Sequence, residues 1–282
     1  MTGQRLLGRV AMVTGGSSGI GRACAVRLAS EGCQVVAVSS RNVDGLRETA
    51  ELIASAGGEC LVQLCDVSSE DSVGLAMGVA AERFGRLDIL VNNAGRPQEA
   101  APADALDAAE WDLTLDVDLR GAFLVTRAAI PLLRKSTAGA SVVNVSSTNS
   151  FLHVPGNPAY AAAKGGLDAL TRQMAIEYAR DGIRFNGVNP GLIVVESVQE
   201  FLDASPEDRI AYETAYPLPR LGLPEDVAGV VCFLASDDAA YVTGSSIPVD
   251  GGLSVLSPSA VLNRHLRLPP RAERTRFGPR RP

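Results

Sequence analysis

The stretch "VTGGSSGIGRA" (residues 13–23) places three glycines between an apolar run and a segment with helical periodicity. Gly15, Gly19 and Gly21 would allow a tight turn, a close approach of backbone N–H groups to a phosphate, and close packing of helix on strand. A flexible turn is the alternative, but the position between a first strand and a first helix favours binding of a dinucleotide pyrophosphate. The predicted contacts from this loop are Gly15, Ser17, Ser18, Gly19, Ile20 and Gly21.

Outside this loop, short apolar runs alternate with longer segments of helical periodicity. The predicted strands are 9–15, 34–40, 60–66, 87–93, 140–147, 183–190 and 245–252. The predicted helices are 19–31, 43–56, 70–84, 117–135, 158–181 and 224–236, with shorter ones near 104–113 and 198–215. Apolar strands joined by helical crossovers form a parallel sheet that needs cover on both faces. We therefore predict an α/β fold, with a single doubly wound domain over residues 1–254.

The composition is that of an ordinary globular chain of 282 residues, 46% hydrophobic and 21% charged. The net charge of −6 argues against a nucleic-acid-binding body. Five cysteines without a C-x-x-C pair are expected to be reduced thiols of a cytoplasmic protein, with no disulfide and no metal site. The N-terminus shows no signal-peptide core, and no apolar run approaches the roughly 20 residues of a membrane span. We therefore expect no membrane association.

Residues 255–282 differ from the rest of the chain. Seven arginines and one acid give this segment a charge of +6, so the other 254 residues carry −12. Frequent proline and the lack of a lasting periodicity predict a flexible tail. A basic arm that binds a partner subunit or a polyanion is the alternative.

The end of the second predicted strand bears on the choice of cofactor. An NAD-binding chain would carry an acid about 20 residues beyond the glycine loop, to hold the adenine-ribose hydroxyl. Here the strand ends in Ser39, Ser40, Arg41 and Asn42, with no acid before Asp44. A guanidinium flanked by hydroxyls suits a 2′-phosphate, which an acid would repel. We predict that NADP(H) is preferred over NAD(H), with a surface arginine at a strand end as the alternative.

The stretch "YAAAK" (160–164) carries the candidate chemistry. Tyr160 and Lys164 lie one turn apart on a predicted helix, and Lys164 is one of only two lysines among 26 basic residues. A phenol with a pKa near 10 is a poor base at neutral pH, but a fixed ammonium nearby stabilises the phenolate. Tyr160 would then give a proton to a carbonyl oxygen or accept one from an alcohol. A solvated helix surface is the alternative.

Taken together, the motifs resemble those of the short-chain dehydrogenase/reductase (SDR) family, single-domain branch, from about residue 8 to 254. The matching stretches are "TGGSSGIG" (14–21), "CDV" (65–67), "NNAG" (92–95), "VSS" (145–147), "YAAAK" (160–164), "NPG" (189–191), "RLGLPEDVA" (220–228) and "VTGSSIPVDGG" (242–252). Within the branch the chain is similar to 3-oxoacyl-thioester reductases, glucose 1-dehydrogenases and small-ketone reductases. The resemblance implies a seven-stranded Rossmann sheet and a homotetramer.

The resemblance also assigns roles to single residues. Asp66 and Val67 would contact the adenine, and Ser147, 13 residues before Tyr160, would hydrogen-bond the substrate oxygen. Taken alone, Ser147 would be a serine that ends a strand. The remaining residues implied for the dinucleotide are Asn92, Ala94, Gly95, Tyr160, Lys164, Pro190, Gly191 and Ile193.

Two positions depart from the family pattern. Where the family has an asparagine that helps hold a water beside the lysine, this chain has Asp118. Aspartate keeps the backbone carbonyl that shares this role, and its carboxylate would favour the charged form of Lys164. We therefore count Asp118 among the catalytic candidates and expect a proton relay that is retained but altered. Where the family often has a threonine that contacts the nicotinamide amide, this chain has Val195, which lacks a hydroxyl.

Segment 192–219 lies where the family places its substrate lid. The apolar residues in it would line a pocket or form the packing face of an amphipathic helix, and the second reading is favoured. The candidate substrate contacts are Arg96, Asn149, Phe151, Leu192, Val195 and Phe201. His153, between Ser147 and Tyr160, is expected to be a surface residue.

The sequence thus predicts an NADP(H)-dependent oxidoreductase that passes a hydride between nicotinamide and the carbon of a ketone or secondary alcohol. One alternative is a non-catalytic dinucleotide-binding regulator, which would not need Ser147, Tyr160 and Lys164 together. A second is an NAD-dependent sugar alcohol dehydrogenase. A third is a sugar-nucleotide epimerase or dehydratase, whose extra C-terminal domain 28 residues cannot build. With His153 and His265 as the only histidines, a Ser-His-Asp hydrolase is disfavoured.

Overall fold

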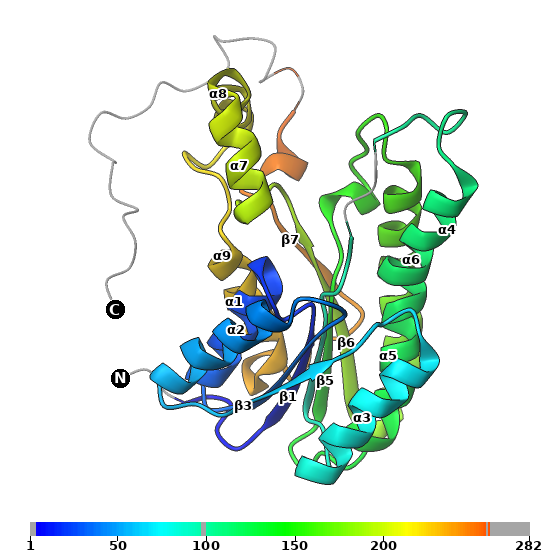
Figure 1. The fold of residues 1–282 in the computed structure, drawn as a ribbon, viewed down its shortest axis with the longest axis vertical. Helices are drawn as coiled ribbons and strands as arrows, with labels where there is room; N and C mark the ends of the chain where they lie inside the picture. Colours follow the sequence, from blue (N-terminus) through cyan, green and yellow to red (C-terminus); the bar gives the residue numbers. More distant parts are fainter. Residues whose placement is uncertain (1–3, 97–99, 258, 260–282) are drawn as a thin grey trace.

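A computed structural model describes residues 4–96, 100–257 and 259 of the chain. Its centre is one seven-stranded sheet in the order β3-β2-β1-β4-β5-β6-β7, in which every neighbouring pair is parallel (Figure 1). The strands are β1 Val10–Thr14, β2 Gln34–Ser39, β3 Cys60–Leu64, β4 Ile89–Asn92, β5 Ala140–Val145, β6 Ile183–Pro190 and β7 Ser246–Val249. The predicted α/β fold with a doubly wound, seven-stranded parallel sheet is confirmed.

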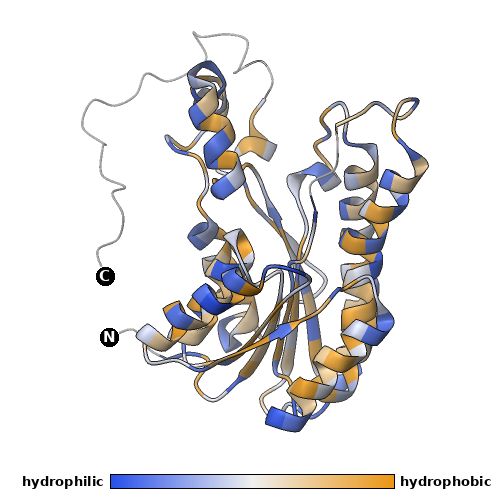
Figure 2. Ribbon diagram, in the orientation of Figure 1, coloured by the Kyte–Doolittle hydropathy of each residue, from blue (hydrophilic) through white to orange (hydrophobic). Residues whose placement is uncertain are grey.

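Helices cover both faces of this sheet, as apolar parallel strands require. On one side lie α1 Gly19–Ser30, α2 Val43–Ser55 and α9 Pro224–Ala235. On the other lie α3 Glu70–Phe84, α4 Ala108–Leu115, α5 Gly121–Leu133 and α6 Pro158–Glu177. Two separate hydrophobic cores, one on each face of the sheet, hold these layers together. In Figure 2 the helices of both layers mix hydrophobic and hydrophilic residues, as expected of helices with one face on a sheet.

The central strands are short apolar runs because they are buried on both faces. Every residue of β1, β4 and β5 is buried, whereas the edge strands β3 and β7 have no fully buried residue. Burial on both faces removes the alternation of apolar and polar residues that a half-exposed strand would show. This is why the strands could be found in the sequence as apolar runs rather than by a period of two.

Glycine is required in the loop that joins β1 to α1. Gly15 has φ +65°, a left-handed conformation that favours glycine. A Cβ on Gly21 would lie 2.0 Å from the carbonyl oxygen of Gly15. The loop therefore folds back on the first turn of α1 so closely that only backbone fits between them.

Two predicted helices differ from the structure. The helix expected over 117–135 begins as a π-helical turn, η1 Asp116–Arg120, which leads directly into α5. The helix expected over 198–215 is two helices, α7 Glu196–Ala204 and α8 Pro206–Ala215. The break comes at Ser205, because the residue before a proline is pushed out of the α region and Pro206 has no N–H to donate. Ser205 instead caps α8, with its Oγ accepting the N–H of Asp208 at 3.3 Å.

The remaining short segments are 3₁₀ turns: η2 Thr148–Ser150, η3 Ala179–Asp181, η4 Asp237–Ala239 and η5 Leu253–Val255. The predicted flexible tail lies almost wholly outside the described residues. Among the residues that are described, none of the helices combines the length and the hydropathy that a membrane span needs.

Candidate active site

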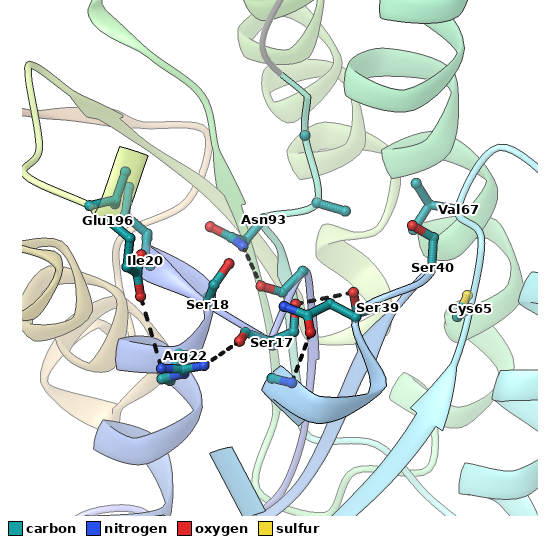
Figure 3. A pocket seen from close by; sticks show the side chains of 18 of the residues that line it. Ser17, Ser18, Ile20, Arg22, Ser39, Ser40, Cys65, Val67, Asn93 and Glu196 are labelled. Atoms are coloured by element: carbon teal, nitrogen blue, oxygen red, sulfur yellow. Dashed lines mark hydrogen bonds and ion pairs between the residues drawn. The ribbon is translucent and has the colours of Figure 1, made fainter. Parts of the chain in front are cut away.

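A cavity of about 970 Å³ opens at the carboxyl ends of β1, β2 and β4 (Figure 3). The chain order of the sheet reverses between β1 and β4, and ligands of doubly wound sheets bind at such a reversal. We call this space the phosphate-loop cavity. The predicted cofactor residues that line it are Gly15, Ser17, Ser18, Gly19, Ile20, Gly21, Ser40, Asp66, Val67, Ala94 and Gly95.

The cavity wall is fixed where β1 and β4 end. Thr14 Oγ1 accepts the backbone N–H groups of Asn93 and Ala94, both at 2.9 Å. Asn93 Nδ2 donates to the carbonyl oxygens of Thr14 at 3.0 Å and Gly15 at 3.3 Å. These bonds hold the glycine loop against the end of β4.

These residues fit a bound dinucleotide. Helix α1 begins at the cavity with no acid in its first turn, and Ser18 at its N-cap makes no side-chain cap bond. The first N–H groups of α1 therefore have no side-chain acceptor there, and a helix N-terminus of this kind attracts phosphate.

Asn92 and Arg41, both predicted to bind cofactor, do not line this cavity. Asn92 is buried, and its Nδ2 donates to Asn144 Oδ1 on β5 at 2.8 Å and to Thr126 Oγ1 on α5 at 2.9 Å, between the sheet and that helix. Its neighbour Asn93 lines the cavity instead. Arg41 is exposed and is not among the lining residues, whereas Asn42, Asp44 and Glu48 are.

Arg22, which the sequence analysis did not single out, connects the phosphate-loop cavity to α7 (Figure 3). Its Nη2 donates to the Ser17 carbonyl at 2.6 Å and pairs with Glu48 at 2.8 Å. Its Nη1 lies 3.9 Å from Glu196 Oε1, at the start of α7. A Cβ on Gly19 would lie 2.9 Å from Cγ1 of Val195, so the lid segment packs directly on the glycine loop. The apolar residue at 195 is thus in contact with the loop that the family resemblance links to the cofactor.

A second cavity of about 510 Å³, which we call the tyrosine cavity, adjoins the first. Ile20, Asn93, Gly95 and Val195 line both spaces. Its other predicted site residues are Tyr160, Lys164, Asp118, Arg96, Asn149, Pro190, Gly191, Leu192 and Ile193. The structure therefore brings the predicted catalytic helix beside the predicted cofactor loop.

Lys164 and Asp118 form a buried ion pair in this cavity. Lys164 Nζ lies 3.0 Å from Asp118 Oδ1, with the two side chains 5% and 0% exposed. The same Nζ donates to the carbonyl of Val145 at 3.3 Å and lies 5.3 Å from the centroid of the Tyr160 ring. Burial disfavours the ammonium, but its electrostatic interactions with Tyr160 and Asp118 outweigh burial, so the pKa of Lys164 is raised above its ordinary value. Lys164 is a fixed cation beside the phenol.

The π turn η1 places Asp118 in this pair. In the π turn the N–H of Gly121 donates to the carbonyl of Asp116, five residues back. Asp118 Oδ2 also accepts the backbone N–H of Arg96 at 3.1 Å. The carboxylate therefore ties the end of β4 to the lysine of α6.

Ser147 lies at the end of β5, half-buried, and caps the turn η2. Its Oγ accepts the N–H of Asn149 at 3.1 Å, and its carbonyl accepts Asn189 Nδ2 at 3.1 Å. Asn189 Nδ2 also donates to the carboxylate of Asp168 at 2.9 Å. Ser147 is not among the residues that line the tyrosine cavity, whereas its neighbour Ser146 lines it and donates to the Lys164 carbonyl at 3.1 Å.

Among the candidate substrate residues, Phe151 and Phe201 do not line the tyrosine cavity. Phe151 is 45% exposed, and Phe201 is 48% exposed with its ring edge-on to Tyr212 at 6.3 Å. His153 is exposed, as expected, and its Nδ1 lies 3.1 Å from the carbonyl of Asn149. The residues that sequence reasoning missed in this cavity are Asn93, Val145, Ser146 and Asn157. The motifs "NNAG" (92–95) and "VSS" (145–147) contain the first three and could have indicated them, whereas Asn157 lies outside the matching motifs.

Comparison with known proteins adds to this geometry. A family model described as "Enoyl-(Acyl carrier protein) reductase" matches residues 15–254. A 3beta-hydroxysteroid dehydrogenase of Eggerthella lenta is 39% identical over 251 residues, which cover 89% of this chain and 95% of the relative. A levodione reductase of Leifsonia aquatica is 40% identical over 257 residues, 89% of this chain and 96% of the relative.

Solved structures with the same fold are similar to this chain in sequence as well. A protein provisionally assigned as a 2-deoxy-d-gluconate 3-dehydrogenase from Agrobacterium tumefaciens, with NADP bound, superposes with a TM-score of 0.79 at 35% identity. The match covers 89% of this chain and 98% of that one.

The ion pair gives a test at Asp118. The change Asp118→Asn removes a carboxylate that raises the pKa of Lys164, so the lysine should lose its proton at a lower pH. We expect the rate of alcohol oxidation to begin its fall at high pH at a lower pH than in the unchanged protein. Steady-state rates across pH measure this shift.

Asp116→Asn is the matched control, because Asp116 lies in the same π turn but is half-exposed and pairs only loosely with Arg120, at 3.9 Å. Its profile should match that of the unchanged protein. Coincident profiles for Asp118→Asn and the unchanged protein would show that the carboxylate has no part in the proton relay.

Proposed function

The chain belongs to the short-chain dehydrogenase/reductase family and is an oxidoreductase that acts on CH–OH groups; from this premise we propose that it is an NADP(H)-dependent ketoreductase or alcohol dehydrogenase in which Tyr160 transfers the proton. The observation that carries the proposal is the position of Lys164, 5.3 Å from the Tyr160 ring in a cavity that adjoins the glycine loop. The nicotinamide dinucleotide, when bound, supplies or accepts the hydride.

The chain's own residues account for the proton. Lys164 is held as a cation by Asp118 and stabilises negative charge on the phenol oxygen of Tyr160. Tyr160 then donates a proton to the carbonyl oxygen during reduction, or removes one from the alcohol during oxidation. We assign Ser147 to the substrate oxygen, because its Oγ accepts one hydrogen bond and donates none among the described residues. The hydroxyl of Ser147 can therefore donate its hydrogen to a ligand.

The proposed dinucleotide site follows the lining of the phosphate-loop cavity. The pyrophosphate would lie over the first turn of α1, where the N–H groups lack side-chain acceptors. Asp66 and Val67 would lie at the adenine, and Pro190, Gly191 and Ile193 near the nicotinamide, since these last three line the tyrosine cavity. We propose no direct side-chain contact for Asn92, which is bonded inside the sheet.

Different residues near the phosphate-loop cavity favour NADP(H) and NAD(H). NADP(H) is supported by Ser40 and Arg41 at the end of β2 and by the NADP bound to a structure similar to this one. NAD(H), and with it an NAD-dependent sugar alcohol dehydrogenase, is supported by Asp44 and Glu48, which line the cavity where Arg41 does not. We propose NADP(H), because the exposed Arg41 side chain is long and unpaired among the described residues, and a guanidinium pairs well with a phosphate.

We also propose that the enzyme is a homotetramer. A groove of about 890 Å³ between η1, α5 and α6 carries apolar side chains on the outside of the fold, among them Leu119, Phe123 and Leu170. Phe123 is 38% exposed. A second copy that packs helix on helix would cover them, and sedimentation equilibrium measures the assembly.

Loss of the phenol oxygen tests the mechanism. In Tyr160→Phe the ring and its packing remain, but no group can transfer the proton, so we expect kcat to fall by about a hundredfold or more. Reduction of a panel of ketones, oxoacyl thioesters and sugars with NADPH and NADH measures it. Tyr241→Phe, at a fully exposed tyrosine, should leave kcat unchanged. Full turnover by a folded Tyr160→Phe protein would contradict the proposed mechanism.

The cofactor preference is tested at Arg41. The change Arg41→Ala removes the cation that would pair with the 2′-phosphate, so kcat/KM for NADPH should fall about tenfold or more while that for NADH stays within about twofold. Arg47→Ala, at an exposed arginine of α2, is the control. Higher kcat/KM with NADH than with NADPH in the unchanged protein would reverse the assignment.

A further inference from the structure

Arg96 lies beside the proposed catalytic residues, at the edge of the tyrosine cavity. It follows Gly95 at the end of β4 and lines the tyrosine cavity with Tyr160 and Lys164. Its backbone N–H donates to Asp118 Oδ2 at 3.1 Å, and the other oxygen of that carboxylate lies 3.0 Å from Lys164 Nζ. The base of the Arg96 side chain is therefore fixed relative to the lysine by one shared carboxylate.

The guanidinium of Arg96 is held by one nitrogen. Nη1 donates to Glu110 Oε1 at 2.7 Å and to Thr114 Oγ1 at 3.3 Å, both on α4. The side chains of Arg96 and Glu110 are 28% and 18% exposed. A guanidinium has five N–H donors, and within the described residues Nε and Nη2 make no hydrogen bond. Partly buried donors that lie on a cavity are normally satisfied by a ligand or water.

Two asparagines on the same cavity also have spare hydrogen-bonding capacity. Asn149 Oδ1 is buried and has no hydrogen-bond partner among the described residues. Asn157 stands at the N-cap of α6, yet its side chain makes no cap bond, whereas Asn42 caps α2 through the N–H of Gly45 at 2.8 Å. An asparagine at an N-cap usually bonds the first turn, so Asn157 is available for another partner.

The cations around the cavity are already matched by carboxylates. Arg96 is paired with Glu110 and Lys164 with Asp118, and the carboxylate of Asp168 also acts on Lys164. A substrate carboxylate would add an uncompensated charge to this partly buried site, which is costly. A neutral hydroxyl or carbonyl oxygen can accept from the guanidinium without adding charge. On the lid side, Leu192, Ile193 and Val198 offer an apolar wall for the carbon skeleton.

We propose that Arg96, with Asn149 and Asn157, binds a second, neutral oxygen function of the substrate. The preferred substrates are then ketones that carry a further hydroxyl or carbonyl group, and the corresponding alcohols, rather than plain alkyl ketones or keto acids. This inference rests on the proposed function, since it places the substrate in the tyrosine cavity.

The test compares three ketones on one ring: cyclohexanone, a hydroxycyclohexanone and an oxocyclohexane carboxylate. Each is reduced by the full chain with NADPH and with NADH. We expect kcat/KM for the hydroxyketone to exceed the other two by about tenfold or more, the worth of a hydrogen bond to a charged group. In Arg96→Met this advantage should disappear, mainly through a higher KM for the hydroxyketone.

Arg83→Met is the matched control, because Arg83 also pairs with a glutamate, Glu59, but lies on α3 away from the cavity. It should keep the advantage of the hydroxyketone. Since Arg96→Met removes a guanidinium that bonds Glu110, the double variant Arg96→Met/Glu110→Gln is measured beside it, with thermal melting of each protein. Asn157→Ala, which breaks no described hydrogen bond, should reduce the same advantage.

Equal kcat/KM for the three ketones, an unchanged ratio in the folded Arg96 variants, or a preference for the carboxylate would overturn the inference and leave the proposed function standing. Absence of turnover of the wider panel of ketones, thioesters and sugars with both cofactors would overturn the proposed function itself, and this inference with it.

Discussion

The buried ion pair between Lys164 and Asp118 is the constraint around which the active site is arranged. Moving two charges out of water costs several kcal/mol per ion, and only close pairing with further hydrogen bonds offsets it. Here the partners come from four parts of the fold: α6, the π turn, the carbonyl of Val145 at the end of β5, and the N–H of Arg96 after β4. If any one of these moved, a buried charge would lose a partner. The cost of burial thus holds the four segments in one arrangement.

The sheet makes that arrangement possible, because parallel strands end at the same edge. β1 and β4 are neighbours in space although β2 and β3 lie between them in sequence, and the chain leaves them toward opposite faces. The bonds from Thr14 to Asn93 and Ala94 join the two strand ends. The glycine loop and the lysine pair are therefore built on adjacent strand ends, and the two cavities share lining residues without a separate domain to align them.

Features governed by local sequence could be predicted, and features governed by tertiary contacts could not. The buried strands and the glycine loop follow from apolar runs and from the conformational freedom of Gly15 and Gly21. The two asparagines 92 and 93 look alike in sequence, but Asn92 ends β4 and is bonded in the interior, whereas Asn93 follows the strand and lies on the cavity. The π turn could not be predicted from helical periodicity, because it adds one residue to a single turn of an otherwise regular helix. Its place in the chain depends on a tertiary contact, the buried pair of Asp118 with Lys164.

Val195 shows how one departure changes the coupling between the two cavities. At this position a hydroxyl would join the lid to a bound ligand by a hydrogen bond, but the valine instead packs on Gly19 of the phosphate loop. The polar link lies one residue further on, where Glu196 faces Arg22 at 3.9 Å, a distance too long for a strong bond. Arg22 in turn bonds the carbonyl of Ser17 within the glycine loop. The start of α7 therefore contacts the glycine loop through apolar packing at Val195 and a weak ion pair at Glu196, rather than through a hydroxyl.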